Sequence, residues 1–331
     1  EFYNYFNGYG AWTFTDDQIE MMKDRRYDVT ENPERPWVVI DQRMGRDTYV
    51  YYGNTDWWHY WFNDIKPTQS HNISFSGGTK KMKYFLSGNY NKEQGMFRQN
   101  PDIYNRYNLR SRLTFDVTKW LNISNNTSYF QSSYTYPGFS NLNSTVYYTT
   151  ASAFACLVPI NPDGTVVGKN DYTSNAVGAG INTILHNENF KNSQTENHMQ
   201  TSTEVTIKPF KQLEIKGNYT YSYASTAYLQ RSVNNDYSQI PGIIESVTTG
   251  GEGEDKLYER INSHTFHSAN IFGTYTDTFN ENHNLKVMAG FNWEQYNRKN
   301  LEATGYDLIT DELSDFNLIT TTRQPVLGGG Q

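Results

Sequence analysis

The sequence predicts an all-β protein, an antiparallel transmembrane β-barrel, from three observations. Apolar and polar residues alternate along runs of about 10 to 15 residues, as they do in strands with one apolar and one polar face. Short turns and long connections alternate strictly between these runs, which is typical of membrane barrels. Only 36% of the residues are hydrophobic, yet 16% are aromatic and 27 are Tyr, so a folded chain uses Tyr for much of its apolar surface.

The first element is not a strand. Residues 1–68 lack the alternation and are expected to form an extracellular loop region with a short helix. Thr15 and Gln18 have the spacing of a capping box, which predicts a helix that begins there and ends near Arg26.

Four hairpins are expected next, over residues 69–296, giving about eight barrel strands. Their short turns lie near residues 78, 119, 210 and 281, and the two longest connections are predicted at 131–195 and 224–260. Residues 297–331 are expected to begin another extracellular loop. Because the chain lacks an initiator Met and ends abruptly after three glycines, we expect a fragment of a wider barrel.

A soluble sheet with one wet face would show the same alternation, so this alternative stays open. Long strand runs, the two classes of connection and aromatic residues near strand ends favour the barrel. Tyr104, Trp120 and Trp293 are examples of such aromatics. In hydrocarbon every backbone polar group must be paired, so a membrane sheet has to close.

Several function classes are disfavoured. The net charge is −7 with scattered basic residues, which argues against a nucleic-acid partner. The chain has none of the HExxH, GxSxG, P-loop or CxxC motifs, so we expect no enzyme activity and no cofactor. Cys156 is the only cysteine, and His264 and His267 point to opposite faces of a strand, so no metal site is predicted.

Several longer stretches resemble a known family. They read "NTDWW", "PTQSHNISFSGGT", "KYFLSGNYNKEQG", "RYNLRSRLTFDVTKWLNIS", "HNLKVMAGFNWE" and "ATGYDLITDEL". In this order and spacing they resemble the SusC family of TonB-dependent outer-membrane transporters of Bacteroidetes, over about residues 52–317. The resemblance implies a barrel of roughly 22 strands with an N-terminal plug, of which this chain holds strands two to nine.

The same resemblance implies a function in the cell outer membrane. Such transporters import large solutes with force from the TonB–ExbB–ExbD complex, and a SusD-like surface lipoprotein closes over them. An oligosaccharide is the expected solute because most family associations are with glycan loci, and an oligopeptide is the alternative. Two other hypotheses are a secreted soluble carbohydrate-binding or glycan-degrading domain and a passive barrel or adhesin.

Two groups of residues are candidates for contact with the solute. The aromatic cluster Trp57, Trp58, Tyr60 and Trp61 either lines a solute site at the barrel mouth or packs an extracellular loop. Charged residues on the polar side of the strands are predicted to face the lumen, where they contact the plug or solute or satisfy one another around water. They are Arg110, Arg112, Glu204, Glu214, Lys216 and Lys286.

Overall fold

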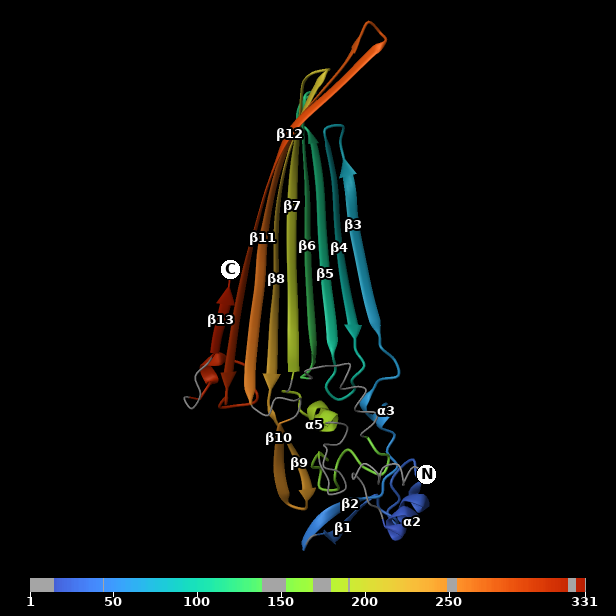
Figure 1. Ribbon diagram of the computed structural model, residues 1–331. Helices are drawn as coiled ribbons and strands as arrows, with labels where there is room; N and C mark the ends of the chain where they lie inside the picture. The colour runs from blue at the N-terminus through green and yellow to red at the C-terminus, as the bar shows by residue number, and fades with distance from the viewer. Residues whose placement is uncertain are drawn as a thin grey trace.

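One large antiparallel sheet dominates the structure (Figure 1). The computed structural model describes residues 15–43, 45–138, 153–168, 180–189, 191–248, 255–320 and 326–330. The sheet has nine strands in the order β13-β12-β11-β8-β7-β6-β5-β4-β3, so strands that follow one another in the sheet also follow one another along the chain. This meander has the simple connectivity of an up-and-down barrel wall.

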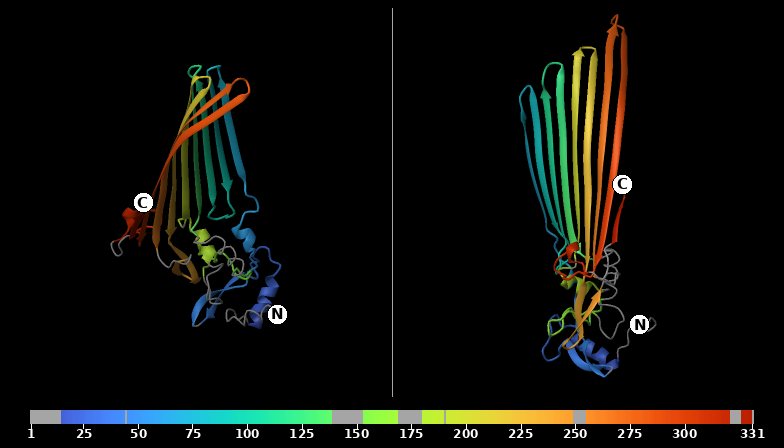
Figure 2. Two further views of the ribbon diagram at one scale, coloured as in Figure 1. Left: turned by 45° about the horizontal axis from the view of Figure 1, so that its top comes forward. Right: turned by 90° about the vertical axis from the view of Figure 1, so that its left-hand side faces the viewer.

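From β3 to β12 the strands lengthen from 11 to 24 residues, and the edge strand β13 has 5. They are β3 (Thr68–Gly78), β4 (Met82–Gln94), β5 (Ile103–Asp116), β6 (Leu121–Pro137), β7 (Lys191–Phe210), β8 (Leu213–Ser232), β11 (Lys256–Phe279), β12 (His283–Tyr306) and β13 (Val326–Gly330). The pairs β3–β4, β5–β6, β7–β8 and β11–β12 are the four hairpins expected from the sequence. Their short turns all lie at one end of the sheet, and the long connections lie at the other (Figures 1 and 2).

Several predicted boundaries are wrong because the strands continue into the expected loops. β6 and β7 extend into 131–195, and β8 and β11 extend into 224–260. β12 likewise runs past residue 296 as far as Tyr306, and β13 lies within 297–331. The alternation of apolar and polar residues becomes irregular in these extensions. The backbone hydrogen bonds between the strands do not depend on that alternation, so the pairing continues.

The two faces of the sheet differ in exposure, and the apolar face is the more open one. Ile73, Leu109, Ile271 and Phe291 are 59%, 56%, 53% and 66% exposed, so no second layer of described residues covers them. On the opposite face the small polar side chains are the crowded ones, as for Ser222 at 8% exposure. A sheet that is curved with its polar face inward produces this difference, whereas a soluble sheet buries its apolar face.

Smaller elements gather at the end with the long connections (Figure 2). They are α2 (Asp16–Arg25), β1 (Val38–Arg43), β2 (Arg46–Tyr51), α3 (Trp57–Trp61), α5 (Ile181–His186), β9 (Asn234–Ile240), β10 (Ile243–Thr248) and the 3-10 turn η2 (Phe316–Leu318). Helix α2 begins with the predicted capping box, in which the Thr15 amide donates to Gln18 Oε1 (2.9 Å) and the Gln18 amide donates to Thr15 Oγ1 (3.3 Å). None of the helices in the described segments has the length and apolar content needed to cross a membrane.

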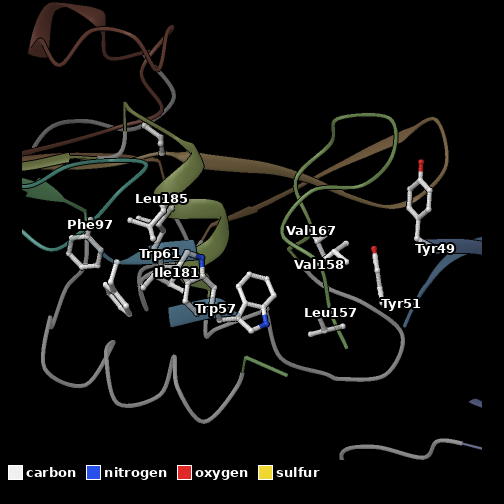
Figure 3. Close-up of a cluster of buried hydrophobic side chains, with 13 residues drawn as sticks. Tyr49, Tyr51, Trp57, Trp61, Phe97, Leu157, Val158, Val167, Ile181 and Leu185 are labelled. Atoms are coloured by element: carbon white, nitrogen blue, oxygen red, sulfur yellow. The ribbon is translucent and has the colours of Figure 1, made fainter. Parts of the chain in front are cut away.

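A cluster of buried apolar side chains lies in these connections (Figure 3). We call it the loop core. It consists of Tyr49, Tyr51, Trp57, Trp61, Phe62, Phe97, Leu157, Val158, Val167, Ile181, Ile184, Leu185 and Val233. Segments far apart in the sequence therefore pack into one unit at the end of the sheet.

Candidate functional site

Two of the four candidate aromatic residues are part of the loop core. Trp57 and Trp61 are 6% and 1% exposed, and their ring centroids lie 4.4 Å apart. Each indole nitrogen is satisfied within the chain, since Trp57 Nε1 donates to the Phe154 carbonyl (2.9 Å) and Trp61 Nε1 donates to Asn182 Oδ1 (3.2 Å). The structure thus supports the packing interpretation for these two residues, whose rings are closed to a solute in this arrangement.

The other two candidates differ from each other. Tyr60 is half-buried, and its hydroxyl lies 2.9 Å from His186 Nε2 while His186 Nδ1 lies 2.6 Å from the Asn182 carbonyl. Desolvation lowers the pKa of His186 and raises the pKa of Tyr60, so both groups stay neutral near pH 7. Trp58 is 51% exposed and is the one member of the cluster that is open to contact from outside the chain.

Local sequence explains why this segment turns inward. Asp56 caps helix α3 by accepting from the His59 amide (3.2 Å), and the helical spacing then brings residues 57 and 61 to the same side. Cys156 packs against the same core, and burial raises the pKa of its thiol to about 12. That thiol is therefore protonated at neutral pH and poorly reactive.

The six charged candidates all lie on the polar face of the sheet, as the register and the alternation along each strand require. Glu214 and Lys216 lie near a short turn. There the Glu214 carboxylate forms ion pairs with Lys208 (2.7 Å) and Lys216 (3.4 Å). Arg110, Arg112 and Lys286 are exposed and Glu204 is half-buried, and none of the four forms an ion pair with a described residue. Whether this face encloses a lumen stays a prediction for all six.

A shallow hollow of about 520 Å³ lies on the polar face around Arg110. An amide chain crosses it, in which Asn89 Nδ2 donates to Asn72 Oδ1 (2.5 Å) and Asn108 Nδ2 donates to Asn89 Oδ1 (3.2 Å). Arg106 lies at its edge with its guanidinium 5.1 Å from the Phe130 ring centroid. This wall offers hydrogen bonds and positive charge to whatever fills the concave side.

A group of tyrosines on the polar face near the long connections was not predicted from the sequence. Tyr104 was noted from the sequence only as an aromatic residue near a strand end, and it shares the polar face with Arg110, since the two are an even number of residues apart on one strand. Tyr134 lies directly opposite Tyr104 on β6. The even spacing of Tyr104 from Arg110 on β5 would have placed Tyr104 on the polar face, whereas β6 has no charged residue from which Tyr134 could be placed in the same way.

Comparisons with known proteins agree with the architecture. No family model matches the chain. The chain is 25% identical over 270 residues to TonB-dependent receptor P3 of Formosa agariphila, which covers 80% of this chain and 25% of that protein. It is 23% identical over 262 residues to TonB-dependent receptor P39 of the same organism, which covers 76% of this chain and 22% of that one.

Solved structures show the same fold. A RagAB peptide importer in a closed-closed state aligns with a TM-score of 0.63 and 18% identity over 85% of this chain and 30% of that one. The open-open state aligns with a TM-score of 0.61 and 15% identity over 97% of this chain and 36% of that one. The chain thus spans about a third or less of these proteins, and the resemblance to SusC-like TonB-dependent transporters and their antiparallel barrel fold is confirmed.

Proposed function

We propose that this chain forms part of the barrel wall of an outer-membrane transporter that imports an oligosaccharide. In this proposal the TonB–ExbB–ExbD complex supplies the force and a SusD-like surface lipoprotein covers the barrel. The similarity to TonB-dependent receptors and to the RagAB structures supports the transporter class.

The exposed apolar face carries the proposal. Large side chains such as Leu109 and Phe291 stay open on the convex side, while hydroxyls, amides and charges crowd the other side. Hydrocarbon is the solvent that favours this arrangement, and a polar passage is the space that the other side would line. The secreted soluble domain is disfavoured because water would meet a wide apolar surface.

The topology then assigns the two ends of the sheet. In bacterial outer-membrane barrels short turns face the periplasm and long connections face the cell exterior. The loop core would therefore lie at the outer mouth, next to the lipoprotein. Its packing makes it a formed surface for such a partner, and Trp58 is an exposed side chain on it.

An oligopeptide is the second candidate solute. It is favoured by the likeness to a RagAB importer whose described cargo is peptide, but identities of 15–19% support the fold and not the cargo. We place the oligosaccharide first because Tyr-rich polar surfaces suit sugar rings, which pair apolar faces with hydroxyl groups.

Binding measurements on the complete transporter with its lipoprotein test this proposal. Purified complex is titrated with neutral hexasaccharides of several linkages and with peptides of similar length. We expect saturable binding of at least one hexasaccharide, and binding of peptides alone would reverse the order of the two candidates. Recovery of the protein in the soluble fraction without detergent would instead refute the transporter class.

A further inference from the structure

Five tyrosines form a continuous group on the polar face at the end of the sheet with the long connections. We call this group the tyrosine arc. It consists of Tyr104 on β5, Tyr134 and Tyr136 on β6, Tyr228 on β8 and Tyr258 on β11. Register places them on one face: Tyr134 pairs with Gln194 of β7, and Gln194 pairs with Tyr228.

The rings contact one another from strand to strand. Tyr104 meets Tyr134 edge to face with centroids 6.4 Å apart, and Tyr134 stacks on Tyr136 at 4.7 Å. Tyr228 interacts with the Tyr136 hydroxyl and meets Tyr258 edge to face at 6.1 Å. The arc crosses from β5 to β11, which at ~4.8 Å per strand is about 19 Å. That length suits an oligomer and exceeds the size of one sugar ring.

Carboxylates hold the ring edges in place. The Tyr134 hydroxyl donates to Asp102 Oδ2 (3.2 Å), and Asp102 Oδ1 also accepts the Phe97 amide (3.3 Å). The Tyr258 hydroxyl donates to Glu302 Oε2 (3.1 Å). The rings are half-buried, so part of each surface stays open while its orientation is fixed. A ligand that stacks on them therefore orders few side chains when it binds.

The charged groups that bond directly to the arc rings favour one class of ligand. Asp102 and Glu302 bond to it directly, and Glu196 lies on the same face of β7 between its two halves. Arg260 is the one arginine seen to contact an arc ring, 5.8 Å from the Tyr228 centroid, in the described part of the chain. An anionic polymer would meet these carboxylates, whereas a neutral sugar can donate its hydroxyls to them.

A peptide fits the arc less well. Recognition of an extended peptide by a sheet uses free backbone donors and acceptors at an edge strand. The arc lies on interior strands, all of which are paired on both sides by the ladders of the nine-stranded sheet. Ring faces and carboxylate acceptors remain, and this combination matches the apolar ring faces and hydroxyl donors of a saccharide.

We infer that the tyrosine arc binds the rings of a neutral oligosaccharide as it enters the barrel. This inference rests on the proposed transport function and names the residues and the charge class of the solute. An open hollow of about 410 Å³ lined by Tyr104, Tyr134, Asp102 and Lys66 lies at one end of the arc. Trp57 and Trp61, for which the sequence left solute contact and loop packing open, are buried in the loop core.

Matched substitutions in the complete transporter with its lipoprotein test the inference. Tyr134→Leu and Tyr228→Leu remove rings of the arc, and Tyr134→Phe keeps the ring without its hydroxyl. Tyr223→Leu is the control, because Tyr223 lies on the same strand as Tyr228 but on the apolar face. Binding of maltohexaose, xylohexaose and mannohexaose is measured by calorimetry, and a heat-modifiable barrel band on electrophoresis shows that each variant is folded.

We expect each Leu variant to weaken binding of the preferred hexasaccharide about three- to tenfold, as for loss of one stacked ring. Tyr134→Phe is expected to retain more affinity than Tyr134→Leu, and Tyr223→Leu to match the wild type. Hexasaccharide binding that is unchanged in both folded Leu variants overturns the arc while leaving the proposed transport intact. If the wild-type protein binds only peptides, or no neutral hexasaccharide, the choice of an oligosaccharide is overturned for the proposed function and for the tyrosine arc.

Discussion

A single arginine placed on the apolar face tests the orientation of the whole sheet. Leu109 is the seventh of the 14 residues of β5 and is 56% exposed on that face. Thr114 lies on the same strand but on the polar face. We expect Leu109→Arg to destabilise the folded barrel strongly and Thr114→Arg to change its stability by less than about 0.5 kcal/mol.

The size of the effect follows from the depth of Leu109. Six residues of β5 precede it and seven follow. With a rise of ~3.3 Å per residue and a tilt of ~40°, it lies about 15 to 18 Å from either end of the strand along the membrane normal. This position is near the midplane of an apolar band about 25 Å tall, where Arg costs ~2–4 kcal/mol. The folding constant would fall roughly 30- to 900-fold.

Unfolding of the complete transporter in lipid vesicles by guanidinium, followed by tryptophan fluorescence, measures both variants against the wild type. Leu109→Gln serves as a further control, since it places a polar group at the same depth without the charge and should cost less. Equal stabilities of Leu109→Arg and Thr114→Arg would show that water covers both faces and would refute the membrane orientation.

Three further predictions concern the end with the long connections. Arg231 is 1% exposed and forms an ion pair with Asp255. Arg231→Met should lower the free energy of unfolding by about 3 kcal/mol, because it leaves the Asp255 carboxylate unpaired. Faster protease cleavage near the pair would report this loss. A Cβ at Gly95 would overlap the Asp102 carboxylate, so Gly95→Ala should cost about 1–3 kcal/mol in chemical unfolding, and an unchanged midpoint would contradict this contact. Burial lowers the pKa of His186 in the folded protein. The contribution of neutral His186 to folding stability is therefore complete above its unfolded-state pKa of ~6.5 and is lost as pH falls through the folded-state pKa. Hydrogen exchange in helix α5, corrected for intrinsic rates, should therefore rise on acidification in the wild type and much less in His186→Gln.

The sheet was predictable because its signal is local. A strand with two different environments repeats every second residue, so residues 107–117 already show apolar and polar faces without knowledge of any neighbour. The hairpin turn at 79–81, which directly follows Gly77 and Gly78 of β3, and the capping box at Thr15 are local in the same sense. Strand ends were harder to place, because the pairing of β11 with β12 continues where the alternation has faded.

The arrangement of side chains from different strands was not predictable from the sequence alone. Trp61 meets Asn182 across 121 positions of the chain, so its burial depends on how separate connections fold together. The tyrosine arc likewise depends on the register of five strands, because the alternation within β6 or β8 alone does not show that Tyr134 and Tyr228 lie on either side of the same β7 residue. The aromatic run at 57–61 is prominent in the sequence, but Trp57 and Trp61 pack inside the loop core.

The shared packing of the loop core limits how solute preference can be transferred between related transporters. Tyr51, Phe97, Leu157 and Val233 come from four separate connections, counting the segment before β3, and are each almost completely buried. A chimaera that receives one foreign connection would keep three native ones. Their side chains are packed around a native residue that the foreign connection lacks, so the replacement would leave voids or cause clashes. Exchange of the connections as a complete set should preserve folding, so recombination that respects this unit is the expected route by which such proteins diversify.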